Sequence, residues 1–165
     1  LISDIIKEKL SELDNYKTTQ YYIDKKFSKY IGIDEINSKV CLIITSGREK
    51  ENYIMNIYSF SDILEVEIIE NGNSVSKMSK TSVAGRAILG GILLGGVGAV
   101  IGGFTANRNN FEKMDKISLK LIVNNTKNPI FEIDFYNDIT GKGLEKKNID
   151  YVEFINKANY WYGLF

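Results

Sequence analysis

The stretch Ile63-Leu-Glu-Val-Glu-Ile-Ile-Glu-Asn-Gly72 is the part of the sequence that determines the predicted fold. Apolar residues alternate with Glu65 and Glu67 along it, which is the pattern of a strand with one buried face and one face toward water. We therefore expect both glutamates to be solvated. Asn71-Gly72 ends the stretch with a hairpin signal, because both residues tolerate a positive φ. The pattern predicts an antiparallel sheet.

More strands are predicted on both sides of this stretch. Both faces of Lys39–Thr45 are apolar, so we expect this segment at the centre of a sheet, with Cys41 as a buried structural thiol. Lys120 is expected to lie across from Glu132 or Asp134 as a cross-strand charge pair. The predicted strands besides the hairpin are Lys29–Asp34, Lys39–Thr45, Tyr53–Phe60, Ile117–Asn124 and Phe131–Tyr136.

A helix is predicted at each end of the chain. Residues 1–18 hold an amphipathic helix, which either docks on the body of the protein or lies against a partner or a membrane surface. The C-terminal segment from Tyr151 to Phe165 has a broad aromatic face, and Asp150 with Glu153 resembles a capping box at its start. Strands bounded by two helices predict the α+β class.

The most unusual stretch is Ala87–Phe104, which has 18 residues without a charged or polar side chain, seven of them glycine. Seven interior glycines would cost a helix roughly 6 kcal/mol relative to alanine, so close packing must return that energy. Small residues spaced four apart allow two helix backbones to approach each other. The predicted helix-packing or membrane-contacting residues are Ala87, Gly91, Gly95, Gly98, Ala99, Gly102 and Gly103.

The length of this segment permits a membrane crossing, but its position in the chain argues against a single one. As a helix it would extend about 27 Å, just short of a hydrocarbon core of about 30 Å. One crossing would place the strands before and after it on opposite sides of a membrane. We therefore predict a helical hairpin, broken near Gly95-Gly96 and inserted between two strands.

Composition argues against several functional classes. Lysine plus arginine and aspartate plus glutamate number 21 each, so no basic footprint for nucleic acid is present. Histidine is absent, and no spacing of nucleophiles or metal ligands stands out. Neither Gly96-x-Gly98 nor Gly141-Lys142 has the surroundings of a nucleotide-binding loop. We predict a non-enzymatic protein with no catalytic, cofactor-binding or metal-binding residues and no cofactor.

The chain has one cysteine and no signal-peptide pattern over Leu1–Leu13, which predicts a cytoplasmic protein, with membrane association left open. Because it begins with leucine instead of methionine, we expect it to be a piece of a longer protein.

Three stretches carry a family resemblance: Tyr58-Ser-Phe-Ser-Asp-Ile63 running to Gly72, Ala84-Gly-Arg-Ala87 with the glycine pairs that follow it, and Pro129 with Phe131–Phe135. Together they resemble uncharacterised proteins of Gram-positive bacteria and their prophages, some of which carry a SHOCT-type C-terminal module. The pattern is AGRAxxGGxxxGGxGAxxGG. This chain shows no such terminal module.

The order of elements is also similar to that of PH-like and GRAM-like domains. This similarity implies an antiparallel PH-like sheet over residues 19–165, with the glycine-rich insertion at 84–106, after an N-terminal helix at 1–18. Such folds bind ligands, lipids or proteins, and fold alone does not fix function.

Two functions are carried forward. The first is a binding or scaffolding module that meets membrane lipid, or its own copies, through residues 87–104. The second is a soluble domain for a protein partner, as in a prophage or host-interaction protein, with the glycine hairpin packed on the sheet.

Overall fold

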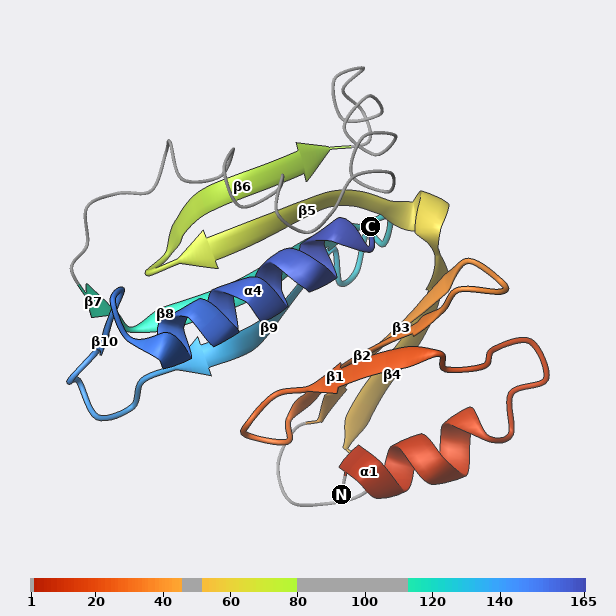
Figure 1. Cartoon of the computed structure of the whole chain (residues 1–165). Coiled ribbons are helices and arrows are strands. Elements are labelled where there is room, and N and C mark those ends of the chain that lie inside the picture. Colours follow the sequence, from red (N-terminus) through yellow and green to blue (C-terminus); the bar gives the residue numbers. More distant parts are fainter. Residues whose placement is uncertain (1, 46–51, 80–112) are drawn as a thin grey trace. The chain divides into compact units, whose positions relative to one another are not determined.

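The computed structural model describes residues 2–45, 52–79 and 113–165, and the chain divides into two compact units, Leu1–Asp62 and Ile63–Phe165 (Figure 1). Among the described residues, every strand pairing is antiparallel, as the alternating patterns predicted.

The first unit is a four-stranded meander preceded by a short helical segment. Consecutive strands are neighbours, so the sheet order is β1-β2-β3-β4 and β3 is an inner strand, as predicted from its two apolar faces. Its elements are α1 (Ile2–Ile5), the π-helical turn η1 (Ile6–Leu10), β1 (Gln20–Ile23), β2 (Lys29–Asp34), β3 (Lys39–Thr45), β4 (Tyr53–Ser59) and the 3-10 turn η2 (Phe60–Asp62).

Helical structure at the N-terminus covers Ile2–Leu10, which is shorter than the predicted residues 1–18. The chain turns after Leu10, where the backbone N–H of Leu13 donates to the carbonyl of Leu10 at 3.4 Å. Asp14-Asn15 follow, and their side chains favour turns over helix.

The core of this unit contains Leu10, Tyr16, Tyr30, Cys41 and Ile43. Cys41 is fully buried and is not in a disulfide, which confirms the predicted structural thiol. Burial raises the pKa of this thiol to about 12, so it stays protonated and unreactive at neutral pH.

Gly32 leaves room for two tyrosine side chains in this core. A Cβ at Gly32 would lie 2.6 Å from Cζ of Tyr30 and 2.7 Å from the hydroxyl oxygen of Tyr16. The hydroxyl groups of Tyr30 and Thr18 are hydrogen-bonded at 3.1 Å. A side chain at position 32 would therefore displace the buried side chains of Tyr16 and Tyr30.

The second unit holds a four-stranded sheet of order β6-β5-β8-β9 and a separate pair of short strands, β7 with β10. Its elements are β5 (Ile63–Glu70), β6 (Asn73–Ser79), β7 (Lys113–Met114), β8 (Lys116–Val123), β9 (Ile130–Asn137), β10 (Leu144–Glu145) and α4 (Ile149–Gly163). Asn71 and Gly72 join β5 to β6 with φ angles of 47° and 81°, so the predicted hairpin turn is confirmed.

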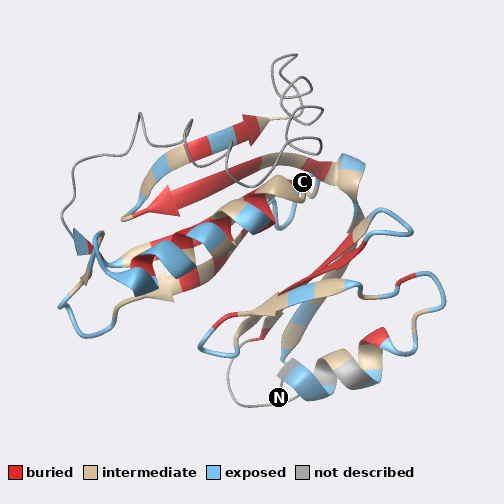
Figure 2. Ribbon diagram, in the orientation of Figure 1, coloured by how far each residue is buried: buried red, intermediate tan, exposed pale blue. Residues whose placement is uncertain are grey.

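The helix α4 lies along one face of this sheet, against β5, β8 and β9 (Figure 1). Figure 2 shows its buried side turned toward the strands and exposed residues along its outer side. Phe154 stacks on Tyr136 with ring centroids 5.2 Å apart, and the Tyr151 hydroxyl donates to the buried carboxylate of Glu70. The aromatic face predicted for this helix is its core face, with Tyr151, Ile155, Ala158, Trp161 and Tyr162 buried.

The predicted capping box is wrong. Asn148, which has extended backbone angles, is the N-cap, and its side chain accepts from the backbone N–H of Asp150 at 2.9 Å. Asp150 already lies inside the first turn, so it cannot cap the helix. The Glu153 carboxylate instead lies 3.9 Å from the ammonium nitrogen of Lys157.

Candidate functional site

The residues predicted to pack helices or meet a membrane lie outside the described residues. This holds for Ala87, Gly91, Gly95, Gly98, Ala99, Gly102 and Gly103, and for the break near Gly95-Gly96. These assignments stay predictions. The structure describes the sheet whose strands precede and follow that segment in the chain.

Strand β5 lies in the sheet between the strand before the glycine segment and a strand after it. It pairs with β6, which precedes the glycine segment, along one edge and with β8, which follows the segment, along the other. Ser79 pairs with Glu65, whereas Ile117 pairs with Glu70. The chain thus leaves the sheet at one end of β5 and returns at the other, about 17 Å away at 3.3–3.4 Å per residue. Both attachment points belong to one sheet.

Asn71 fixes the point of return. Its side-chain oxygen accepts from the backbone N–H groups of Asp115 at 2.8 Å and Lys116 at 3.0 Å, and its amide nitrogen donates to the carbonyl of Lys113 at 3.0 Å. The sequence identified Asn71 only as a turn residue. Its second role depends on residues that no local pattern connects to it.

The sheet face opposite α4 carries charged side chains from three strands. Glu67 was predicted to face water, but its side chain is only 7% exposed. Lys77 on β6 and Lys120 on β8 contact its two carboxylate oxygens at 3.1 and 3.4 Å. Lys77 also pairs with Glu65 at 2.8 Å. The prediction for Glu67 failed because a buried acid is tolerated where cations surround it.

A second group of charges continues this face onto β9. Lys116 contacts Glu132 at 2.7 Å and Asp134 at 3.2 Å, and the buried Ser118 hydroxyl donates to Glu132 at 2.7 Å. We call these side chains, together with Glu65, Glu67, Lys77 and Lys120, the charged face.

The charges set the titration of Glu67. Burial alone would raise the pKa of this carboxyl, but the hydrogen bond from Lys77 and the positive charges of Lys120 and Lys77 outweigh it and lower the pKa to about 2. Glu67 is therefore ionised at neutral pH.

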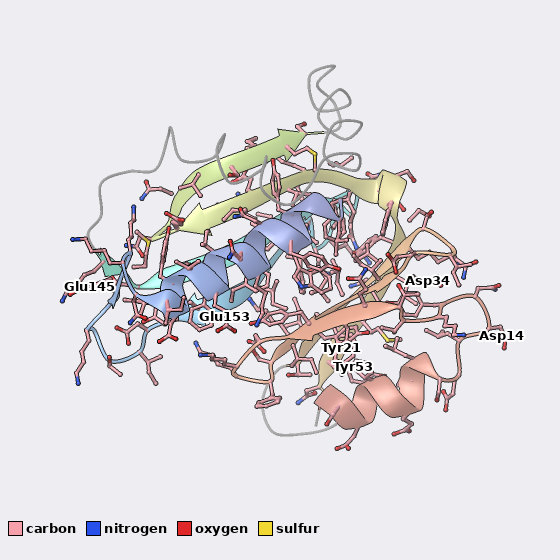
Figure 3. The ribbon with its side chains drawn as sticks, viewed as in Figure 1. Asp14, Tyr21, Asp34, Tyr53, Glu145 and Glu153 are labelled. Atoms are coloured by element: carbon pink, nitrogen blue, oxygen red, sulfur yellow. The ribbon has the colours of Figure 1, made fainter. Side chains whose placement is uncertain are left out.

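Two other buried acids complete turns of the backbone in the first unit. Asp24 accepts from the N–H groups of Ser28 and Lys29 at 2.7 and 2.9 Å. Asp34, labelled in Figure 3, accepts from the N–H groups of Lys17 at 2.7 Å and Asn37 at 3.0 Å. Both carboxylates serve local structure. Within residues 2–45, 52–79 and 113–165, no three His, Cys, Asp or Glu side chains gather as metal ligands.

None of the helices in the described part of the chain is both long and apolar enough to cross a bilayer.

The fold and its order of elements can now be set beside known proteins. The profile of the family described as glycine zipper containing PH domain matches residues 19–137. The chain belongs to this family. The family resemblance is therefore confirmed in its PH-like fold and its glycine zipper, while the detailed glycine pattern and the resemblance to proteins that carry a SHOCT-type module remain predictions.

Two relatives that match this glycine-zipper PH domain in sequence come from the phage SPbeta and its prophage. One is an immunity protein of Bacillus phage SPbeta, 33% identical over 110 residues, which are 64% of this chain and 53% of the relative. The other is the SPbeta prophage-derived uncharacterized membrane protein YomJ of Bacillus subtilis strain 168, 33% identical over 110 residues, which are 64% of this chain and 47% of the relative.

The chain thus spans about half the length of the two curated relatives it matches. Neither relative bears the name of an enzyme. No solved structure matches the chain.

Proposed function

We propose that this glycine-zipper PH domain is a non-enzymatic binding or scaffolding module of a prophage-encoded protein. It associates with a membrane, or with its own copies, through Ala87–Phe104. The observation that carries the proposal is the pairing of β5 with both β6, which precedes this segment, and β8, which follows it after the short β7. A single crossing would pull these strands apart, so the segment leaves the sheet and returns to the same side.

The two faces of the sheet support this proposal over a hairpin packed on the sheet. One face of β5, β8 and β9 is covered by α4, and the other is the charged face. An apolar hairpin laid on the charged face would remove ion pairs from water without supplying new partners, which costs free energy. The family description and the membrane protein among the relatives point the same way.

We further propose that residues 19–165 form one PH-like domain with the insertion at 84–106, after an N-terminal helix within 1–18. In urea we expect a single unfolding transition. The NMR resonances of the tyrosines in the first unit and the fluorescence of Trp161 in the second should report the same midpoint. Two separated transitions would contradict a single domain.

Fractionation of bacteria that express the chain at native level tests the membrane proposal. We expect part of the protein to stay with membranes after a carbonate wash, or to sediment as an oligomer in the soluble fraction. Gly95→Leu should abolish this behaviour, because a large side chain prevents close helix contact. Leu93→Ile is the matched control, since it changes the same segment without adding volume.

Monomeric protein recovered entirely in the soluble fraction, for both the parent chain and Gly95→Leu, would contradict the proposal. That result would favour the alternative, a cytoplasmic domain for a protein partner with the hairpin tucked against the protein.

A further inference from the structure

The outer edge of β4 is an unusual sheet edge. Within the described part of the chain, β4 (Tyr53–Ser59) pairs along one side only, with β3, and is the last strand of its sheet (Figure 1). The register with β3 runs without a shift along the whole strand. The seven residues of β4 include no charged residue, no proline and no glycine. A regular, uncharged edge of this length is a template for pairing with a further strand.

The other edges of the two four-stranded sheets carry features that hinder pairing. β1 has only four residues. β6 carries Lys77, and its register with β5 is shifted by a bulge or irregularity. β9 carries Glu132 and Asp134, and its register with β8 is also shifted. Short length, charges and bulges are the usual protections of an exposed edge. β4 has none of them, which is expected of an edge that another strand covers in the assembled protein.

The side chains of β4 divide between the two faces of the sheet. Tyr53, labelled in Figure 3, packs with Met55 and Ile57 against the core of the first unit. Ile54 lies on the other face and is 49% exposed. An additional strand beside β4 would remove part of this apolar surface from water, which favours association.

The sequence of β4 is suited to pairing with a second copy of itself. In an antiparallel pair centred on Asn56, Met55 lies opposite Ile57 of the second copy, and Ile54 lies opposite Tyr58 of the second copy. Apolar and aromatic pairs of this kind stabilise neighbouring strands. Asn56 lies opposite itself, and two amide groups can each donate and accept a hydrogen bond. No like charges meet anywhere along the pair.

We propose that two copies of the chain associate through β4, antiparallel and with Asn56 on the two-fold axis. This pairing uses the β4 edge of both copies and leaves only the short β1 at each end of the joined sheet. The assembly therefore closes as a dimer and does not grow into a fibre.

A pair of seven-residue strands is a small interface, so we expect a dissociation constant in the micromolar range or weaker. The dimer is then largely dissociated at the low concentrations of a cell extract, and it does not disturb the fractionation test of the glycine segment. Copies that are already gathered at a membrane meet at a much higher effective concentration, where β4 pairs. The β4 interface is separate from Ala87–Phe104, so either proposal can fail alone.

Sedimentation equilibrium of the whole chain in a Gly95→Leu background tests the interface without a contribution from the glycine segment. We expect a concentration-dependent equilibrium between monomer and dimer. Asn56→Lys alone and Asn56→Glu alone should each dimerise at least about tenfold more weakly, because like charges meet on the axis. An equimolar mixture of the two should dimerise again, because opposite charges then meet. The control Asn156→Lys, at an exposed position of α4, should dimerise like the background chain.

Cysteine cross-linking tests the register with smaller changes. Asn56→Cys should form a disulfide between two copies on mild oxidation, since residues opposite each other in antiparallel strands have Cα atoms about 4.5–5.5 Å apart. Ile54→Cys is the matched control, because its counterpart in the second copy lies too far along the strand to be linked. Cys41 is fully buried and does not compete.

Two results would overturn the β4 interface. One is a Gly95→Leu chain that stays monomeric at every concentration while the parent chain dimerises, which would assign self-association to the glycine segment. The other is equal cross-linking of Asn56→Cys and Ile54→Cys, which would show that the copies meet without a fixed register. Recovery of the dimer in the mixture of Asn56→Lys and Asn56→Glu, with neither dimerising alone, would establish the pairing.

Discussion

Lys120 lies directly across from Glu132 in the register of β8 and β9, but its ammonium group contacts Glu67 on β5 instead, with 3.4 Å between Nζ and Oε2. Glu132 is already held by Lys116 and Ser118, each at 2.7 Å. The side chain of Glu67 is 7% exposed and that of Glu132 is 30% exposed. The more deeply buried carboxylate has the greater need of a cation, because it has lost more hydration.

Glu67→Gln is expected to lower the free energy of unfolding by about 1–3 kcal/mol, because it leaves two lysines beside a buried neutral amide. Urea unfolding followed by circular dichroism measures this change. The matched control is Glu153→Gln, which removes an exposed partner of Lys157 and should cost less than about 0.5 kcal/mol. Equal effects of the two variants would show that the charged face adds no more than a surface pair.

The stability of the fold should depend on pH through the same residue. The pKa of Glu67 is lowered from 4.5 to about 2 in the folded chain, so the unfolded state binds the proton more tightly. Its contribution is therefore fully present above about pH 4.5 and is lost as the pH falls toward 2. Urea midpoints measured across this range should fall less steeply for Glu67→Gln than for the parent chain. Parallel curves would contradict the lowered pKa.

Asn71 offers a test that separates backbone conformation from side-chain bonding. Asn71→Gly keeps a residue suited to φ of 47° but removes the bonds to Lys113, Asp115 and Lys116, so we expect a loss of about 1–2 kcal/mol. Asn71→Ala should lose about 1 kcal/mol more, because alanine disfavours the left-handed region. Hydrogen exchange at the Asp115 and Lys116 amides should speed up in both. Unchanged exchange in Asn71→Gly would show that these bonds do not hold the chain there.

Gly32→Ala should lower the thermal midpoint, with a loss of about 1–3 kcal/mol, since its Cβ would meet the Tyr16 and Tyr30 side chains. Adding Tyr16→Phe to this variant removes one of the crowding hydroxyl groups and should recover part of the loss. Differential scanning calorimetry of the two single variants and the double variant measures the coupling. Additive effects would mean that the crowding occurs elsewhere.

The structure corrects two predictions that relied on a single segment. The capping box at Asp150 and Glu153 matched a local pattern, but Asn148 starts the helix two residues earlier because the turn after β10 places it in extended conformation. Glu67 alternates like a water-facing residue, yet its side chain is buried and contacts lysines from both neighbouring strands. In each case the missing information was the position of another segment.

For the candidate site, the sequence identified the glycine segment by its composition but not the charged face. Glu67 and Lys120 are 53 positions apart, and neither belongs to a motif. They come together only because β5 pairs with β8.

The residues alone determined where β2, β3, β4, β5, β8 and β9 run, that Asn71-Gly72 forms a hairpin, that Cys41 is buried and which side of the last helix faces the core, but they did not identify the short strands β1, β7 and β10. Each of these follows from alternation, helical spacing or backbone preference within a few consecutive residues. The tertiary structure alone decided which cation each acid contacts, and that Asn71 holds Asp115, 44 positions later. Such contacts depend on sheet order and burial, which arise when distant segments pack and are not encoded in any short stretch.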